Sequence, residues 1–179
     1  MGAETYNAQL FNLFYLTWNL SIKRGMREKY LLETGQKEKS EVIYSRITFE
    51  EFHNVTRQRN MDALDLIDRY IREARKAFGA LGIISQGIDD IIGEDINDEF
   101  AKKVANVLKL CTYKMIMKQD ASSKKLLAHT FANVLRESEL NIIPNLAKGW
   151  GVLSIAGKDN YTMKIDVSQE ELKVFSGGV

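Results

Sequence analysis

The chain has 179 residues, of which 45% are hydrophobic and 27% charged, and its 25 basic and 24 acidic side chains leave a net charge of +1. This composition predicts a globular protein with a sizeable core and excludes a disordered chain. The balanced charge gives no overall attraction to nucleic acid or to anionic membranes. The single cysteine, Cys111, excludes an internal disulfide and fits a reducing compartment.

Apolar residues recur at helical spacing from residue 6 to residue 31, which predicts a long amphipathic helix. The stripe consists of Leu10, Phe14, Trp18, Ile22 and Gly25. We expect it to pack on the core rather than on a membrane surface, because the basic residues come only late in the helix. The polar residues 33–41 that follow predict a loop.

A run of β-branched and aromatic residues from Ile43 predicts a buried strand that ends in two adjacent carboxylates, Glu50 and Glu51. Open α/β sheets bind ligands at the carboxyl ends of their strands. Two carboxylates there can reach a metal-bound water and an attacking water, which makes them the acidic half of a site that splits phosphate. The alternative is a strand that ends in two solvated glutamates. His53 follows closely enough to neighbour such a site.

A second helix is predicted near residues 59–78 from another apolar stripe. Asn60 or Thr56 can cap its start, and Gly79 can end it in the left-handed conformation. The strand predicted at residues 81–85 comes next, so the order of strand, helix and strand predicts a parallel sheet with a right-handed crossover.

The second helix carries charged residues along its exposed face and basic residues at its end. Asp65 with Arg69, and Asp68 with Arg72, are spaced for ion pairs on its exposed face. The basic residues at its end, which include Arg72 and Arg75, either complement the helix dipole or reach a phosphate on a neighbouring subunit.

Gln86 follows the second strand and is therefore expected at the same sheet edge as Glu50 and Glu51. A glutamine at this position can orient a water against a terminal phosphate, or it can be a plain loop residue.

The second half of the chain predicts further alternation of helix and strand. We expect a loop over residues 89–97, a helix around residues 100–108 and a strand over residues 111–118, in which Met115 and Met117 fill the core.

Asp120 is expected to cap a fourth helix, and Ser138 to start a short helix that Pro144 interrupts. A hairpin is predicted from residues 151–156 and 161–167, followed by a last helix. That helix has a capping box, Ser168 with Glu171, and the pair Gly177-Gly178 is expected to end it. Together the elements predict one three-layer α/β domain over residues 1–179, with a mostly parallel sheet, helices on both faces and a C-terminal β-hairpin.

Several chemical signatures are absent from the sequence. It contains neither the phosphate-binding loop G-x-x-x-x-G-K-[ST] nor G-x-G-x-x-G. Two histidines and one cysteine make no zinc constellation, and no nucleophile elbow supports a hydrolase triad. Signals for nucleic-acid binding are thin, because the basic clusters have no aromatic stacking platform beside them.

The order of motifs resembles the C-terminal part of the ATPases that power type IV secretion and conjugation, TraC-like proteins of the HerA–FtsK branch of RecA-like motors. The matching stretches are A-Q-L-F-N-L from Ala8, I-T-F-E-E-F-H-N from Ile47, I-D-R-Y-I-R-E-A-R-K from Ile67, G-I-I-S-Q from Gly82, Y-K-M-I-M-K-Q-D from Tyr113, S-E-L-N-I-I-P from Ser138 and V-S-Q-E-E-L-K-V-F-S-G-G from Val167. No single stretch is diagnostic, and their order and spacing carry the resemblance.

The resemblance implies a role for each matching position. Ile47 to Glu51 would be the Walker B strand, in which Glu50 holds the water shell of Mg²⁺ and Glu51 polarises the attacking water. Gln86 would be the polar sensor after the next strand, and Arg72 or Arg75 would act across a subunit boundary. The sequence departs from the family in carrying Glu50 where aspartate is common, which bears on the geometry of the metal site.

The family's phosphate-binding loop lies upstream of these motifs, so we expect this chain to be the C-terminal portion of a longer RecA-like ATPase domain. Two carboxylates cannot replace the amides and the lysine that cradle phosphates, so the chain alone should not hydrolyse ATP. The resemblance further implies ATP and Mg²⁺ as ligands of the intact protein, a hexameric ring, other type IV secretion subunits as partners, possible DNA contact, and a cytoplasmic location at the inner face of the membrane. The alternative is a stand-alone, non-catalytic α/β module that acts through protein contacts.

Overall fold

The structure is a computed structural model that describes residues 3–57, 59–93 and 95–174. The chain divides into two compact units, Met1–Leu110 and Cys111–Val179, which we call unit 1 and unit 2. Each has its own sheet and its own buried side chains.

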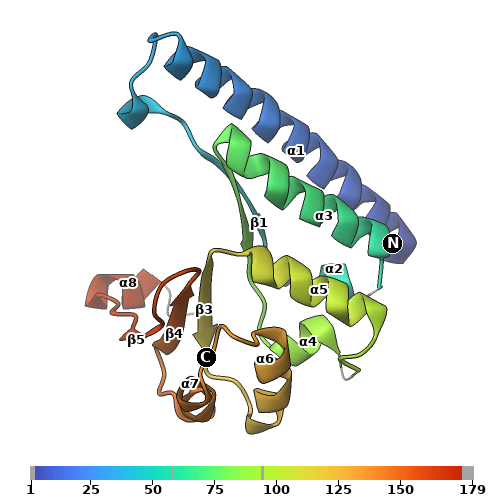
Figure 1. Ribbon diagram of the computed structural model, residues 1–179, viewed down its shortest axis with the longest axis vertical. Helices are drawn as coiled ribbons and strands as arrows, with labels where there is room; N and C mark the ends of the chain where they lie inside the picture. Colours follow the sequence, from blue (N-terminus) through green and yellow to red (C-terminus); the bar gives the residue numbers. More distant parts are fainter. Residues whose placement is uncertain (1–2, 58, 94, 175–179) are drawn as a thin grey trace. The chain divides into compact units, whose positions relative to one another are not determined.

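Unit 1 alternates helices and strands as the sequence predicts (Figure 1). Its elements are α1 (Ala3–Glu33), β1 (Ser45–Phe49), α2 (His53–Thr56), α3 (Met61–Ala74), β2 (Gly79–Ile83), α4 (Ile88–Ile92) and α5 (Glu99–Leu110). The three long helices and both strands are confirmed. The expectation of a loop over residues 89–97 is wrong in part, because Ile88, Ile91 and Ile92 are buried on one side of the short helix α4.

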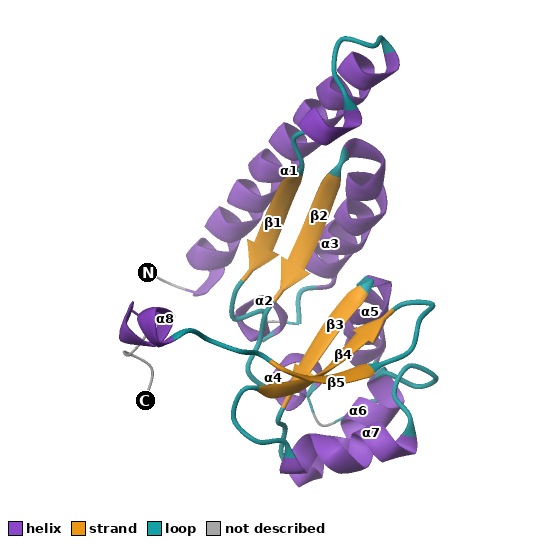
Figure 2. Cartoon of the chain, turned by 90° about the vertical axis from the view of Figure 1, so that its left-hand side faces the viewer, coloured by secondary structure: helices purple, strands orange, loops and turns teal. Residues whose placement is uncertain are grey.

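Strands β1 and β2 form the predicted parallel pair, in register from Ser45↔Gly79 to Phe49↔Ile83. Helices α1 and α3 both lie against one face of this pair (Figure 2), and the alternate residues Arg46 and Thr48 are exposed. Within unit 1 the helices therefore cover one face rather than both. The reason is that α5, the long helix after β2, packs on α3 and α4 instead of on the sheet.

An aromatic cluster holds α1 and α3 on the sheet. The ring of Phe14 lies 5.1 Å from that of Phe49 and 5.6 Å from that of Tyr70, and the rings of Trp18 and Tyr70 are 6.0 Å apart. The hydroxyl of the buried Tyr70 hydrogen-bonds to Ser21 Oγ at 3.1 Å, and burial raises the pKa of this phenol. The predicted stripe of the first helix thus packs on the core, through Phe14 and Trp18.

Two glycines allow the backbone of unit 1 to pack closely. A Cβ at Gly25 of α1 would lie 1.6 Å from the carbonyl oxygen of Ala77, so only glycine fits there. A Cβ at Gly79 would lie 3.0 Å from the Cβ of Ala74. The expected left-handed helix end is found one residue earlier, at Phe78 with φ 50° and ψ 30°, because Gly79 already begins β2.

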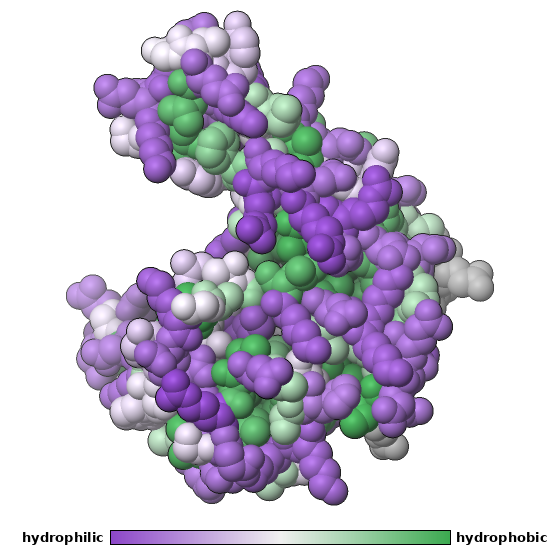
Figure 3. Space-filling model, in the orientation of Figure 1, coloured by the Kyte–Doolittle hydropathy of each residue, from purple (hydrophilic) through white to green (hydrophobic). Residues whose placement is uncertain are grey.

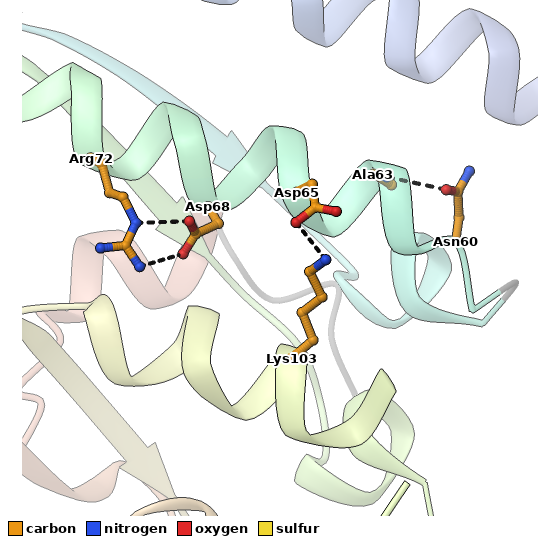
Figure 4. A network of polar contacts seen from close by, with 6 residues as sticks. All are labelled: Asn60, Ala63, Asp65, Asp68, Arg72 and Lys103. Atoms are coloured by element: carbon orange, nitrogen blue, oxygen red, sulfur yellow. Dashed lines mark hydrogen bonds and ion pairs between the residues drawn. The ribbon is translucent and has the colours of Figure 1, made fainter. Parts of the chain in front are cut away.

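The exposed side of α3 is hydrophilic (Figure 3), and its polar contacts are drawn in Figure 4. Asn60 caps the helix by accepting a hydrogen bond from the Ala63 N–H at 3.1 Å. The expected pairing of Asp65 with Arg69 is wrong, because Asp65 pairs with Lys103 of α5. The Arg69 guanidinium instead lies 5.5 Å from the centre of the Trp18 ring.

Unit 2 contains β3 (Tyr113–Met117), α6 (Lys124–Thr130), α7 (Glu137–Ile142), β4 (Trp150–Ile155), β5 (Tyr161–Lys164) and α8 (Gln169–Val174). The predicted hairpin is β4–β5. Strand β3 joins it antiparallel to β4, so this sheet, of order β3-β4-β5, departs from the mostly parallel sheet predicted. The reason is that α6 and α7 return the chain to the end of β3, where Met117 pairs with Gly151.

The last helix of unit 2 begins as predicted. Ser168 Oγ accepts a hydrogen bond from the Glu171 N–H at 3.2 Å, and the Ser168 N–H donates to Glu171 Oε2 at 2.8 Å. This second bond is the main reason that the pKa of Glu171 is lowered. The glycines expected to end the helix, Gly177 and Gly178, lie outside the described residues.

The two faces of the unit 2 sheet differ from what the sequence predicts. Ile116 and its neighbour on β4, Val152, are buried, whereas Met115 and Met117 are exposed. The expectation that these methionines fill the core is therefore wrong. Successive side chains of a strand alternate in direction, so once Ile116 is buried its two neighbours must point to the other face.

Candidate functional site

The carboxyl ends of β1 and β2 remain paired beyond the last residues of the strands. The Ile84 N–H donates to the carbonyl of Phe49 at 2.9 Å, and the Phe52 N–H donates to the carbonyl of Ile84, also at 2.9 Å. These two bonds hold the segment that follows β1 against the segment that follows β2. They therefore bring the residues after both strands to one edge of the parallel sheet, where such sheets bind ligands.

Glu51 lies at this edge in an unusual backbone conformation, with φ 51°. Left-handed conformations disfavour residues other than glycine by roughly 1–2 kcal/mol and persist only where the surroundings impose them. Here Phe49 and Phe52 impose it, because both are buried, their rings lie 6.0 Å apart, and the chain must turn between them. Strain of this kind clusters at functional sites.

The Glu51 carboxylate contacts one residue from each neighbouring segment. The Gln86 side-chain amide donates from Nε2 to Glu51 Oε1 at 3.2 Å. His53 Nδ1 lies 3.1 Å from Glu51 Oε2, a contact that is an ion pair when the imidazole is protonated. The structure thus brings together Glu51 and Gln86, as the sequence predicts, and adds His53, which the sequence could place only as a neighbour.

The polar atoms of this edge are incompletely satisfied. Among the described residues, Glu51 Oε2, His53 Nδ1 and the Ser85 hydroxyl are sequestered from solvent without a hydrogen bond of good geometry. Although Glu51 Oε2 and His53 Nδ1 are close, their contact is poorly aligned. Buried polar atoms without partners are uncommon in folded proteins and need an explanation such as a missing ligand, ion or water. The serine before Gln86 was not singled out from the sequence, because a lone serine after a strand carries no signal.

Glu50 precedes this cluster and is exposed, and the described residues give it no hydrogen bond or ion pair. A carboxylate in this state is free to bind the water shell of Mg²⁺, which prefers oxygen ligands and retains several waters. The described residues contain no group of three or more histidine, cysteine or acidic side chains that could hold a metal directly. The water-mediated contact of Glu50 with Mg²⁺ therefore stays a prediction.

Arg72 and Arg75, the other predicted site residues, lie elsewhere. Arg72 donates to both oxygens of Asp68, at 2.7 and 2.9 Å, and this pairing raises the pKa of Arg72 (Figure 4). Arg75 lies in the 3-10 turn Arg75–Ala77 before β2, at the amino end of the sheet. Neither arginine contacts Glu51 or Gln86 within the described chain, so any role across a subunit boundary stays a prediction.

The chain has the mixed α/β fold of a partial RecA-like domain, similar to that of VirB4. The structure of VirB4 of Thermoanaerobacter pseudethanolicus superposes with a TM-score of 0.69 over 96% of this chain, at 20% sequence identity. An uncharacterized protein of Bacillus anthracis, pXO2-09, is 27% identical over 98% of the chain. The chain spans 40% of the VirB4 chain and 27% of the Bacillus protein.

No protein-family model matches the sequence. Within the described residues, none of the helices combines the length and the apolar character needed to cross a membrane.

Proposed function

We propose that this chain supplies the acidic edge of the ATPase site in a motor of the type IV secretion and conjugation class, as part of a longer protein. The contact between Glu51 and Gln86 at the carboxyl ends of two parallel strands carries the proposal. The VirB4-like fold supports it, because VirB4 is a type IV secretion ATPase and this chain follows its fold over nearly its whole length.

In this proposal each side chain at the edge has a separate role. Glu51 accepts a proton or a hydrogen bond from the attacking water, and Gln86 orients the Glu51 carboxylate. Glu50 would hold the water shell of Mg²⁺. Bound Mg·ATP supplies the phosphoryl group and the charge neutralisation that the metal provides. The phosphate cradle must come from sequence outside this chain, because the chain carries no such loop.

The reading frame upstream of Met1 gives the first test. A G-x-x-x-x-G-K-[ST] motif roughly 150–250 residues earlier supports the motor ATPase. In that longer protein, Glu51→Gln should reduce ATP turnover by about a hundredfold or more and leave ATP binding within about twofold, because the carboxylate acts on the water and not on the nucleotide. Equal loss of binding and turnover would contradict the role assigned to Glu51.

The chain alone should show no ATP hydrolysis above buffer. The measurement is phosphate release by the purified chain with millimolar Mg·ATP, beside its Glu51→Gln variant. Magnesium-dependent turnover that Glu51→Gln abolishes would mean that this chain holds a complete site, against the proposal.

A second candidate function is a stand-alone module that works through protein contacts. The observation that favours it is the outer side of α1, where Leu13, Leu16 and Leu20 are 64%, 61% and 68% exposed at helical spacing. A true start codon at Met1, with no upstream phosphate-binding loop in the reading frame, would support this function.

The partners and location of the motor are also proposals. We expect a hexameric ring when the protein is intact, contact with other type IV secretion subunits and with DNA, and a cytoplasmic position peripheral to the inner membrane. Sedimentation of the longer protein with and without nucleotide tests the ring.

A further inference from the structure

A second concave site lies in unit 1 at the amino ends of the same two strands. It is a cavity of about 520 Å³, lined by Tyr44 and Arg46 around the start of β1 and by Arg75 and Phe78 before β2, with backbone of both strands between them. Four residue steps along a strand cover roughly 13 Å, so this cavity is separate from the edge that carries Glu51. Its volume falls in the range of sites for small molecules.

The cavity has an excess of positive charge. Arg46 and Arg75 are exposed, and among the described residues neither has an ion pair, in contrast to Arg72, which is bound to Asp68. The described lining contains no acidic side chain. Guanidinium groups match phosphate oxygens two at a time, so a concavity lined by two arginines without an ion pair suits an anion.

The cavity also presents aromatic surface. The rings of Tyr44 and Phe78 meet edge to face at 5.6 Å, and Tyr44 is 63% exposed. The backbone of Phe78 has a left-handed conformation, with φ 50°, which is strained for a bulky residue. The Phe78 carbonyl accepts a hydrogen bond from the Ser45 N–H at 3.1 Å, which fixes this conformation against β1.

We propose that this cavity binds a nucleotide, with its phosphate on Arg46 and Arg75 and its base against the ring of Tyr44. An anion alone would not need an exposed aromatic ring, and a base alone would not need two guanidinium groups. The source is either a free mononucleotide or one unit of a single-stranded nucleic acid, in which stacking on aromatic rings and contacts to the backbone combine in the same way. This site is independent of the proposed ATPase edge.

The test measures fluorescence anisotropy of two probes with the whole chain, in EDTA so that no metal contributes. The probes are a fluorescent nucleoside monophosphate and a labelled oligothymidine. Arg46→Ala and Arg75→Ala should each weaken binding by about tenfold. Arg75→Lys should weaken binding less than Arg75→Ala, because lysine keeps the positive charge and loses only the two-pronged geometry of the guanidinium. If the oligothymidine binds more tightly than the monophosphate, the natural ligand is a single-stranded nucleic acid. If it binds equally or more weakly, the natural ligand is a free nucleotide.

Lys76→Ala is the matched control, because it removes the same charge from the residue beside Arg75 and Lys76 does not line the cavity. It should change affinity by no more than about twofold. Tyr44→Ala should weaken the binding of both probes but leave competition by inorganic phosphate unchanged.

Any of four outcomes overturns the proposal: no binding at millimolar probe, equal losses for Lys76→Ala and Arg75→Ala, no effect of Tyr44→Ala, or equal competition by an acidic peptide. Glu51→Gln should leave this binding unchanged. If it abolishes binding, the probe occupies the other edge of the sheet, and the proposed function would survive while this inference would fail. Circular dichroism of each variant confirms that the exposed substitutions leave the fold intact.

Discussion

The two sheets of this chain both bury an apolar face but expose opposite kinds of face. In unit 1 the aromatic face of β1–β2 lies under α1 and α3, and the open face shows Arg46 and Thr48. In unit 2 the open face of the sheet is apolar, with exposed Tyr113, Met115 and Met117 on β3. Parallel sheets are usually buried on both faces, so the exposed polar face of the β1–β2 pair is unusual. An exposed apolar face, like that of the unit 2 sheet, usually marks a contact with another molecule or segment.

This difference separates the parts of the chain suited to small polar groups from the part suited to a protein surface. The open face and both ends of the unit 1 sheet carry charged and amide side chains, which suit nucleotide chemistry. The open face of the unit 2 sheet carries methionine and tyrosine, residues that recur at adaptable protein interfaces. If the two units are as distinct as their exposed faces, a substitution in one unit should leave the stability of the other unchanged.

The largest effect is expected from Gly25→Ala, which forces a Cβ onto the backbone of Ala77. We expect unit 1 to lose about 3 kcal/mol of stability or more. The chain has two tryptophans, Trp18 in unit 1 and Trp150 in unit 2, so in a Trp150→Phe background the fluorescence reports unit 1 alone. Urea unfolding followed by Trp18 should shift strongly for Gly25→Ala.

The control for that experiment is Ile143→Ala, at a fully buried position of unit 2. It should cost about 2–5 kcal/mol in unit 2 and leave the Trp18 transition in place. A Trp18 transition that moves equally for both variants would show that the two units unfold as one.

A middle-sized effect separates the two faces of β3. Ile116→Gln puts an amide on the buried face and should cost about 2–4 kcal/mol, whereas Met115→Gln, next to it on the open face, should change stability by no more than about 0.5 kcal/mol. Unfolding midpoints of the two variants give the comparison. Similar losses for both would mean that the methionine face is covered within the folded chain.

The smallest effect concerns a buried carboxylate of α1. Lys37 and the Ile43 N–H both bond Glu28 and lower its pKa below the ordinary 4.5. A lowered carboxyl pKa gives stability that is present above the unfolded value and is lost as the pH falls through the folded value. The Trp18 transition should therefore weaken below pH 4.5, and Glu28→Gln should show a smaller change over that range. An unchanged pH profile in the variant would assign the acid sensitivity to other groups.

The sequence predicts unit 1 well because its signals are local. The stripe through Phe14 and Trp18, the Asn60 cap and the order of strand, helix and strand each follow from short-range rules. The position of Gln86 beside Glu51 follows from the same parallel pairing. Their catalytic roles stay predictions.

What the sequence could not predict depends on contacts between distant residues. The burial of Ile116 in place of the methionines is set by its pairing with Val152 on another strand. Lys103 displaces Arg69 as the partner of Asp65 because α5 lies beside α3. The cavity joins Tyr44 and Phe78, which are far apart in the sequence, and so supplies an aromatic surface next to arginines that no linear motif contains.

The pair of phenylalanines around Glu51 has a consequence for how the site responds to a ligand. Because Phe49 and Phe52 are held in the core, the backbone of Glu51 between them is fixed before any ligand arrives. Ligand binding at the proposed site would then need little ordering of this backbone segment, because folding has already met most of that entropy cost. The stability of the fold should consequently change far less on substitution of the Glu51 side chain than on loss of either flanking ring.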